Sequence, residues 1–190
     1  DNSVTTLTSV ANNTIKGSLV ANLPSGVPAY FFINDPVTIE WTKKGSIGNL
    51  TIDYSSTGTF VPITDDPYIG TIHSAYSSGA TPTGTFQYTA WSAPSKVSET
   101  FKVRLRNNTP PAGTELTALS ATFAVRPKFT TWSAPALNDI WYASDTIRDI
   151  KWNSVSATKN DGTKPKVKIE YSVDGGAYAG NTIVTNLDNE

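Results

Sequence analysis

The chain contains no cysteine and no methionine among its 190 residues. Without cysteine it can form no disulfide bond, so its stability has to come from packing or assembly. The absence of methionine, even at position 1, is what we expect of a processed or excised fragment. The first residues also lack the basic and apolar segments of a secretory signal peptide. We therefore expect any such signal to have been removed or to lie outside this fragment.

An excess of charge of one sign and long apolar runs are missing too. The 15 Lys and Arg residues nearly balance the 16 Asp and Glu residues, and no basic run occurs. This balance argues against nucleic acid as a partner. No apolar stretch approaches the roughly 20 residues of a membrane-spanning helix, so we expect no membrane insertion. Apolar residues at the spacing of an amphipathic helix are equally scarce.

Threonine, serine and turn-forming residues are abundant instead. There are 27 threonines and 19 serines, and threonine favours strands because its branched Cβ fits a pleated surface. The 12 prolines and 13 glycines supply the turns that many short strands need. The composition therefore predicts an all-β fold.

Alternation of apolar and polar residues predicts the individual strands. In residues 37–41 the first, third and fifth positions are apolar, which gives a strand one buried face and one solvent face. The same alternation recurs over residues 50–54, 101–106, 121–126 and 167–171. The pattern predicts Asp53 and Ala124 on the solvent face. The side chains predicted to be buried include Ile39, Trp41, Ile52, Tyr54, Val103 and Phe123.

A pair of strand sequences occurs twice along the chain. The first copy spans residues 37–41 and 50–55, and the second spans 150–152 and 167–172. The two tryptophans, Trp41 and Trp152, are 111 residues apart, which is the length of one β-sandwich domain. Self-similarity at a fixed period predicts a tandem array of modules.

Aligning the two copies on their tryptophans gives the expected boundaries. Residues 1–17 are the tail of a preceding module or a linker, residues 18–126 are a complete module, and residues 127–190 are a partial one. The second module is expected to lack its later strands, which were cleaved or are supplied by another chain. Pro127 lies between the modules and should limit bending there, because proline fixes its φ.

The strand sequences resemble the immunoglobulin-like repeat of bacterial surface and secreted proteins. The residues that carry the resemblance are Ile39-Glu40-Trp41, Ile52-Asp53-Tyr54-Ser55, Tyr88-x-x-Trp91-x-x-Pro94, Phe101-Lys102-Val103-Arg104-Leu105 and, in the second copy, Ile169 through Asp174-Gly175-Gly176. The resemblance covers about three quarters of the chain and implies tandem Ig-like β-sandwich domains. It departs from the family in an extra stretch at 67–84, which we expect to be a long loop free to contact neighbours.

The resemblance implies a non-enzymatic structural module of a bacterial extracellular or cell-surface protein, most concretely part of an S-layer or similar surface array. Its partners would be other copies of itself or neighbouring modules of the parent chain. Two alternatives remain open: an adhesin or carbohydrate-binding module that binds cell-wall or host glycans, and a non-catalytic appendage of a secreted hydrolase. Aromatic residues that could contact a glycan or a lattice neighbour, or could pack at the module junction, are Trp132, Trp141, Tyr142 and Tyr76.

Few residues suggest chemistry. The one histidine, His73, cannot form a two-histidine metal site, and we expect it in a surface loop. Asp65 and Asp66 could bind calcium, which takes carboxylate oxygens, or could simply form a turn. Three Asn-x-Ser/Thr sequons could carry glycans, at Asn12, Asn49 and Asn107. No paired carboxylates or nucleophile–base set stands out, so we predict no catalysis and no cofactor other than calcium.

Overall fold

The computed structural model consists of β-strands and their connections. It describes residues 17–24, 30–60, 66–108, 110, 115–136, 139–140, 142, 149–173, 175–178 and 180–189. These residues form 13 strands and no helix, so the predicted all-β fold is confirmed. Among them there is accordingly no helix of the length and apolarity that crossing a bilayer requires.

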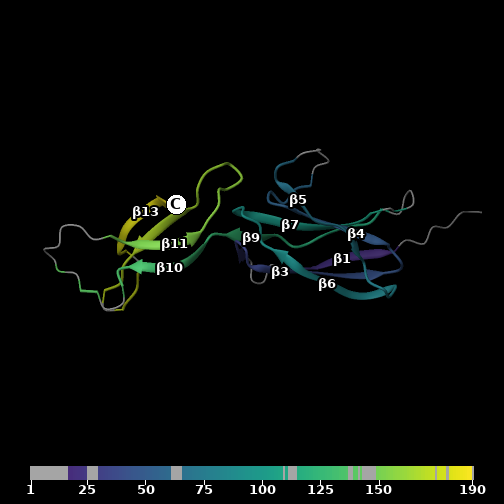
Figure 1. Ribbon diagram of the computed structural model, residues 1–190, viewed down its shortest axis with the longest axis horizontal. Helices are drawn as coiled ribbons and strands as arrows, with labels where there is room; N and C mark the ends of the chain where they lie inside the picture. Colours follow the sequence, from purple (N-terminus) through teal and green to yellow (C-terminus); the bar gives the residue numbers. More distant parts are fainter. Residues whose placement is uncertain are drawn as a thin grey trace, which may run out of the picture.

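Strand pairing gives four sheets among the described residues. The sheets fall into two groups, which lie end to end in Figure 1. We call these groups the first unit and the second unit. The first unit consists of β1 (Ser18–Leu23), β2 (Tyr30–Phe32), β3 (Pro36–Lys44), β4 (Asn49–Ser55), β5 (Ile69–Ser77), β6 (Thr83–Ser92), β7 (Ser98–Asn107), β8 (Thr117–Leu119) and β9 (Phe123–Arg126). The second unit consists of β10 (Lys128–Ala134), β11 (Lys151–Val155), β12 (Lys166–Glu170) and β13 (Thr182–Asp188).

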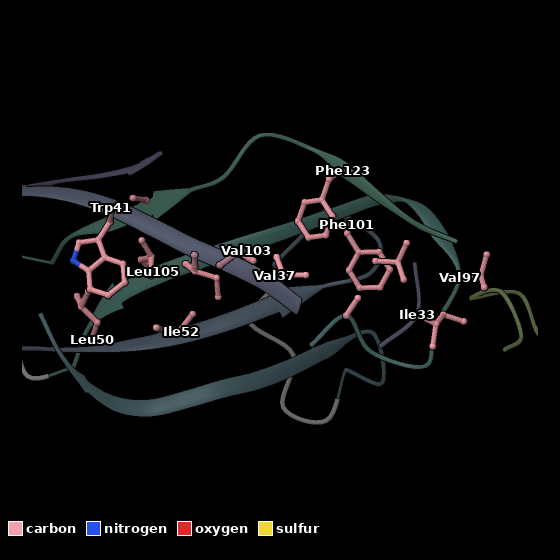
Figure 2. Close-up of a cluster of buried hydrophobic side chains, with 14 of the residues drawn as sticks. Ile33, Val37, Trp41, Leu50, Ile52, Val97, Phe101, Val103, Leu105 and Phe123 are labelled. Atoms are coloured by element: carbon pink, nitrogen blue, oxygen red, sulfur yellow. The ribbon is translucent and has the colours of Figure 1, made fainter. Parts of the chain in front are cut away.

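Two sheets make up the first unit. One has the antiparallel order β1-β3-β6. The other has the order β2-β9-β7-β4-β5, with β8 also pairing with β7, and only its β2–β9 pair is parallel. Side chains from both sheets meet in one hydrophobic cluster, shown in Figure 2. The central strands β3 and β7 therefore bury one face, as their alternating sequences predict.

The centre of this cluster matches the sequence pattern. Five of the six side chains predicted to be buried have an exposed fraction of 1% or less: Ile39, Trp41, Ile52, Val103 and Phe123. The sixth, Tyr54, is half-buried and stacks on Trp91. The rings of Tyr76 and Phe86 cover the indole of Trp41, with centroid distances of 5.7 and 6.3 Å.

Two residues predicted to face solvent are buried instead. Asp53 is 2% exposed because its Oδ2 accepts hydrogen bonds from Arg104 Nη2 at 2.9 Å and Arg106 Nε at 3.0 Å, on the neighbouring strand β7. Ala124 is 3% exposed because β9 lies between β2 and β7, and Tyr30 of β2 is beside it in register. Alternation alone could not predict either, because both depend on neighbouring strands.

The stretch at 67–84 was expected to be a long loop, and this expectation is wrong. Residues Ile69–Ser77 form β5, which pairs antiparallel with β4 along its length. The close approach of the two strands requires a glycine at position 70, since a Cβ there would lie 2.3 Å from Cε1 of Tyr54. Ile72 and Tyr76 pack against the hydrophobic core.

Four strands of the second unit correspond to four of the first. The antiparallel pair β10–β11 matches β1–β3, and the pair β12–β13 matches β4–β5. Trp132 lies opposite Trp152 in the first of these pairs, as Ala21 lies opposite Trp41. The connections differ in length: residues 45–48 join β3 to β4, whereas residues 156–165 join β11 to β12. The longer connection contacts the first unit.

Candidate functional site

The β11–β12 loop contacts the first unit and forms what we call the joint. Asn160 Nδ2 donates to the carbonyl of Ser56 at 3.0 Å, and Ser56 Oγ donates to Asn160 Oδ1 at 2.8 Å. Tyr68 Oη donates to the carbonyl of Asn160 at 3.1 Å. Next to Asn160, Lys159 forms an isolated parallel β-bridge with Val97. Figure 1 shows this loop reaching toward the N-terminal end of β7.

Ion pairs flank the covalent connection between the units. Arg126 donates to Glu99 through Nε at 3.0 Å and Nη2 at 2.8 Å. This hydrogen bonding by Arg126 holds the pKa of the Glu99 carboxyl below its ordinary value. Lys128 Nζ lies 3.2 Å from Asp35 Oδ1. Because these side chains are 30–63% exposed, water and salt screen the pairs, and each contributes little to stability.

The second unit exposes several large apolar side chains. A groove of about 230 Å³, which we call the β10–β12 groove, is lined by Phe129, Trp132, Trp152, Val167, Lys168, Ile169 and Glu170. Phe129 is 60% exposed and Trp132 is 58% exposed. Another hollow of about 640 Å³ lies between β11 and β13. Trp152 lines both and is half-buried, whereas its counterpart Trp41 is fully buried.

The aromatic residues singled out by sequence do not share one surface. Trp132 lies in the groove, and its Nε1 donates to the carbonyl of Pro135 at 2.9 Å, which fixes its ring. Tyr142 is 67% exposed, and Trp141 lies outside the described residues. Tyr76 lies in the first unit, half-buried on β5.

The position predicted for His73 is wrong. It lies on strand β5 rather than in a surface loop, and its ring is half-buried against two tyrosines, Tyr76 and Tyr88. The sequence around it has no strict alternation, which is why the strand was missed. In this position the imidazole serves as a packing group between β5 and β6.

The two aspartates of the calcium hypothesis differ in how far the structure describes them. Asp65 lies outside the described residues. Asp66 Oδ1 accepts from the backbone amide of Tyr68 at 2.8 Å, and its carbonyl accepts from Ile69 at 3.1 Å, so it shapes the turn before β5. Within the described ranges, no three His, Cys, Asp or Glu side chains gather as metal ligands.

The three sequons also fall in different surroundings. Asn49 begins β4 and is exposed. Asn107 is half-buried, and its Oδ1 accepts from the amide of Leu116 at 2.8 Å. Asn12 lies outside the described residues. Of the two described sites, Asn49 is the more accessible one for a glycan.

A buried lysine in the first unit connects β3 to the turn between β5 and β6. Lys43 is 2% exposed, and its Nζ donates to Ser78 Oγ at 3.0 Å and to the carbonyl of Gly79 at 2.8 Å. The ammonium also lies 5.1 Å from the ring centroid of Phe86. Burial lowers the pKa of Lys43. As a donor to two oxygens, the ammonium ties β3 to the β5–β6 turn.

Sequence reasoning missed the joint and the β10–β12 groove. Nothing in the composition of residues 156–165 distinguishes a contact loop from a solvated one. The one available signal was length, because this connection is six residues longer than its counterpart at 45–48. No protein-family model, curated protein or solved structure gives a significant match to this chain.

Proposed function

We propose that this chain is a non-enzymatic structural part of a bacterial extracellular or cell-surface protein, within an S-layer or similar surface array. In this proposal the two units are tandem Ig-like β-sandwiches, with residues 18–126 complete and residues 127–190 partial. The observation that carries it is the joint at Asn160, which attaches the second unit to the first through the β11–β12 loop, in addition to the covalent connection.

The joint matters because it restricts rotation. Two modules connected only through residues 126–128 could still turn about the bonds that flank Pro127. A second attachment, through Asn160 and the Lys159–Val97 bridge, removes much of that freedom. A surface array requires modules at a reproducible angle, whereas a simple tether requires length alone. The contact therefore supports an assembly role over a flexible spacer.

Replacing Asn160 with alanine is expected to loosen the two units without unfolding either. The variant loses the two side-chain hydrogen bonds to Ser56, each worth about 1 kcal/mol. Because the chain has no cysteine, spin labels can be placed at introduced cysteines in exposed positions Thr89 and Thr185. Electron–electron distance measurements should give a narrow distribution that broadens in Asn160→Ala.

A matched control is Asn153→Ala, which removes a hydrogen bond to Thr131 within the second unit and leaves the joint intact. Its distance distribution should stay as narrow as that of the unmodified sequence. A broad distribution in the unmodified sequence would contradict a fixed joint, and with it the observation on which the array proposal depends.

A carbohydrate-binding module is the second candidate, because the β10–β12 groove presents exposed aromatic rings. Phe129 and Trp132 could stack on sugar rings. Titration with cell-wall and host polysaccharides, followed by tryptophan fluorescence, tests this candidate. Saturable quenching that is lost in Trp132→Ala would favour it, and a flat titration would count against it.

A further inference from the structure

A small polar pocket of the first unit is lined by a buried lysine. The pocket has a volume of about 170 Å³ and lies between the β3–β4 loop and the β5–β6 turn. We call it the Lys43 pocket. Besides Lys43, its polar lining side chains are those of Ser46, Asn49, Ser77, Ser78 and Thr81. Because its described lining residues all fall within 43–82, the pocket belongs to the first unit alone.

The positive charge of Lys43 has no opposite charge beside it among the described residues. The two acceptors of its ammonium, the hydroxyl oxygen of Ser78 and the carbonyl oxygen of Gly79, are both neutral. No other described residue that lines the pocket has a titratable side chain. A charge that is buried without a counter-charge is costly, and the lowered pKa of Lys43 reflects this cost.

Two polar hydrogens at the pocket also have no acceptor within the part of the chain that the structure describes. An ammonium has three hydrogens, and Lys43 donates two of them, to Ser78 and Gly79. The Ser78 hydroxyl accepts from Lys43, and its own hydrogen goes to no described acceptor. Ser78 is only 4% exposed. One positive charge and two free donors therefore meet at one place, which is the complement of a negatively charged oxygen ligand.

Size and charge select among such ligands. Because a water molecule occupies about 30 Å³ in the liquid, the pocket has room for a small oxyanion group with little else. A carboxylate has one negative charge and would leave the pair with Lys43 neutral. A phosphate monoester carries about −1.5 to −2 at neutral pH, so it would leave an uncompensated negative charge beside buried groups.

We propose that the Lys43 pocket binds a carboxylate group. One of its oxygens accepts from the ammonium of Lys43, and the hydroxyl of Ser78 donates to the same group. The carboxylate comes from a free ligand, such as a uronic acid sugar, or from an acidic side chain of this chain. Residues 1–16 contain one such side chain, that of Asp1. The inference does not depend on the proposed function, since it requires no array and no second unit.

Acetate is the probe, because it is a carboxylate with one methyl group attached. The intact 190-residue protein is titrated with sodium acetate at pH 7, and sodium chloride keeps the ionic strength constant. The amide resonances of Ser78 and Gly79 are followed by NMR. We expect saturable shifts with a dissociation constant on the order of 1–10 mM. Glucuronate should bind with similar affinity, and inorganic phosphate at least about threefold more weakly.

Three variants test the two donors. Lys43→Met removes the ammonium but keeps a long side chain against the ring of Phe86, and it should weaken acetate binding at least about tenfold. Lys44→Met is the matched control, because Lys44 is the next residue and is exposed at the end of β3. Its affinity should match that of the unmodified protein. Ser78→Ala removes the other donor and should weaken binding about threefold to tenfold, which keeps the test open if Lys43→Met does not fold.

The pH profile of binding separates a charge pair from a merely structural role of Lys43. A carboxylate favours the protonated amine, so binding raises the pKa of Lys43. By linkage, the affinity should be constant well below the pKa that Lys43 has in the free protein and should fall as the pH rises through it. Acetate stays ionised over this range. The Lys44→Met variant should keep this profile, and Ser78→Ala should keep its shape at a lower affinity.

The Asp1→Asn variant distinguishes the two sources of the carboxylate. If Asp1 occupies the pocket, its replacement should tighten acetate binding at least about threefold, because the competitor is gone. Unchanged affinity would assign the pocket to a free carboxylate. The inference would be overturned by an absence of saturable shifts in both the unmodified protein and Asp1→Asn. Equal affinity in Lys43→Met, or phosphate binding more tightly than acetate, would overturn it as well.

Discussion

Replacing Trp41 with alanine is expected to lower the unfolding free energy of the first unit by about 3–5 kcal/mol. The indole is fully buried, with the rings of Tyr76 and Phe86 against it. Among the described residues its Nε1–H has no hydrogen-bond partner, so its contribution comes from packing. The loss should be measured from denaturant unfolding, with amide exchange of β7 reporting on the first unit.

The repeat supplies the control for this substitution. Trp152 occupies the equivalent position, but it is half-buried and lines the two hollows of the second unit. Trp152→Ala is therefore expected to cost less, about 2 kcal/mol, since part of the removed indole surface already faces the two hollows. Equal losses for the two variants would show that the second unit has a closed core, contrary to this structure.

Replacing Asp53 with alanine should also be costly, by about 3 kcal/mol in the unfolding free energy of the first unit. The substitution removes the carboxylate shared by Arg104 and Arg106 and leaves the side chain of Arg104, 18% exposed, without its counter-charge. Arg106 is 47% exposed and can turn to water, so the full penalty for an isolated buried charge is not expected.

The matched control removes an equally well-formed pair at the surface. Glu99→Ala breaks the two hydrogen bonds from Arg126, but both side chains are largely exposed. Its expected cost is about 0.5 kcal/mol. Urea unfolding of both variants at low and high salt makes the comparison. A loss for Asp53→Ala as small as that for Glu99→Ala would mean that the Asp53 network contributes no more than a surface pair.

How much of the fold was predictable depends on which interactions determine whether a residue is buried and whether it lies in a strand. Period-two alternation correctly places Ile39, Trp41 and Val103 in the core, because their burial follows from strand geometry alone. It fails at Asp53 because a carboxylate can be buried only when a neighbouring strand supplies cations, and that strand lies about 50 residues away in sequence. It fails over β5 because Gly70 and His73 interrupt the pattern while pairing with β4 still holds the strand.

The joint and the groove illustrate the same limit for function. The sequence repeat predicts that Trp152 matches Trp41, and the strand pairs of the two units agree with that match. It does not predict that Asn160 contacts Ser56, since such a contact depends on how two units meet. Nor does it predict the β10–β12 groove, whose lining depends on how β10 and β12 lie relative to each other.

Electron microscopy of the native, full-length parent protein, with and without added calcium, tests the central claim most directly. The account predicts ordered sheets or tubes. If order requires calcium, Asp65 and Asp66 are the first residues to replace. Isolated, flexible rods under both conditions would contradict an array-forming module.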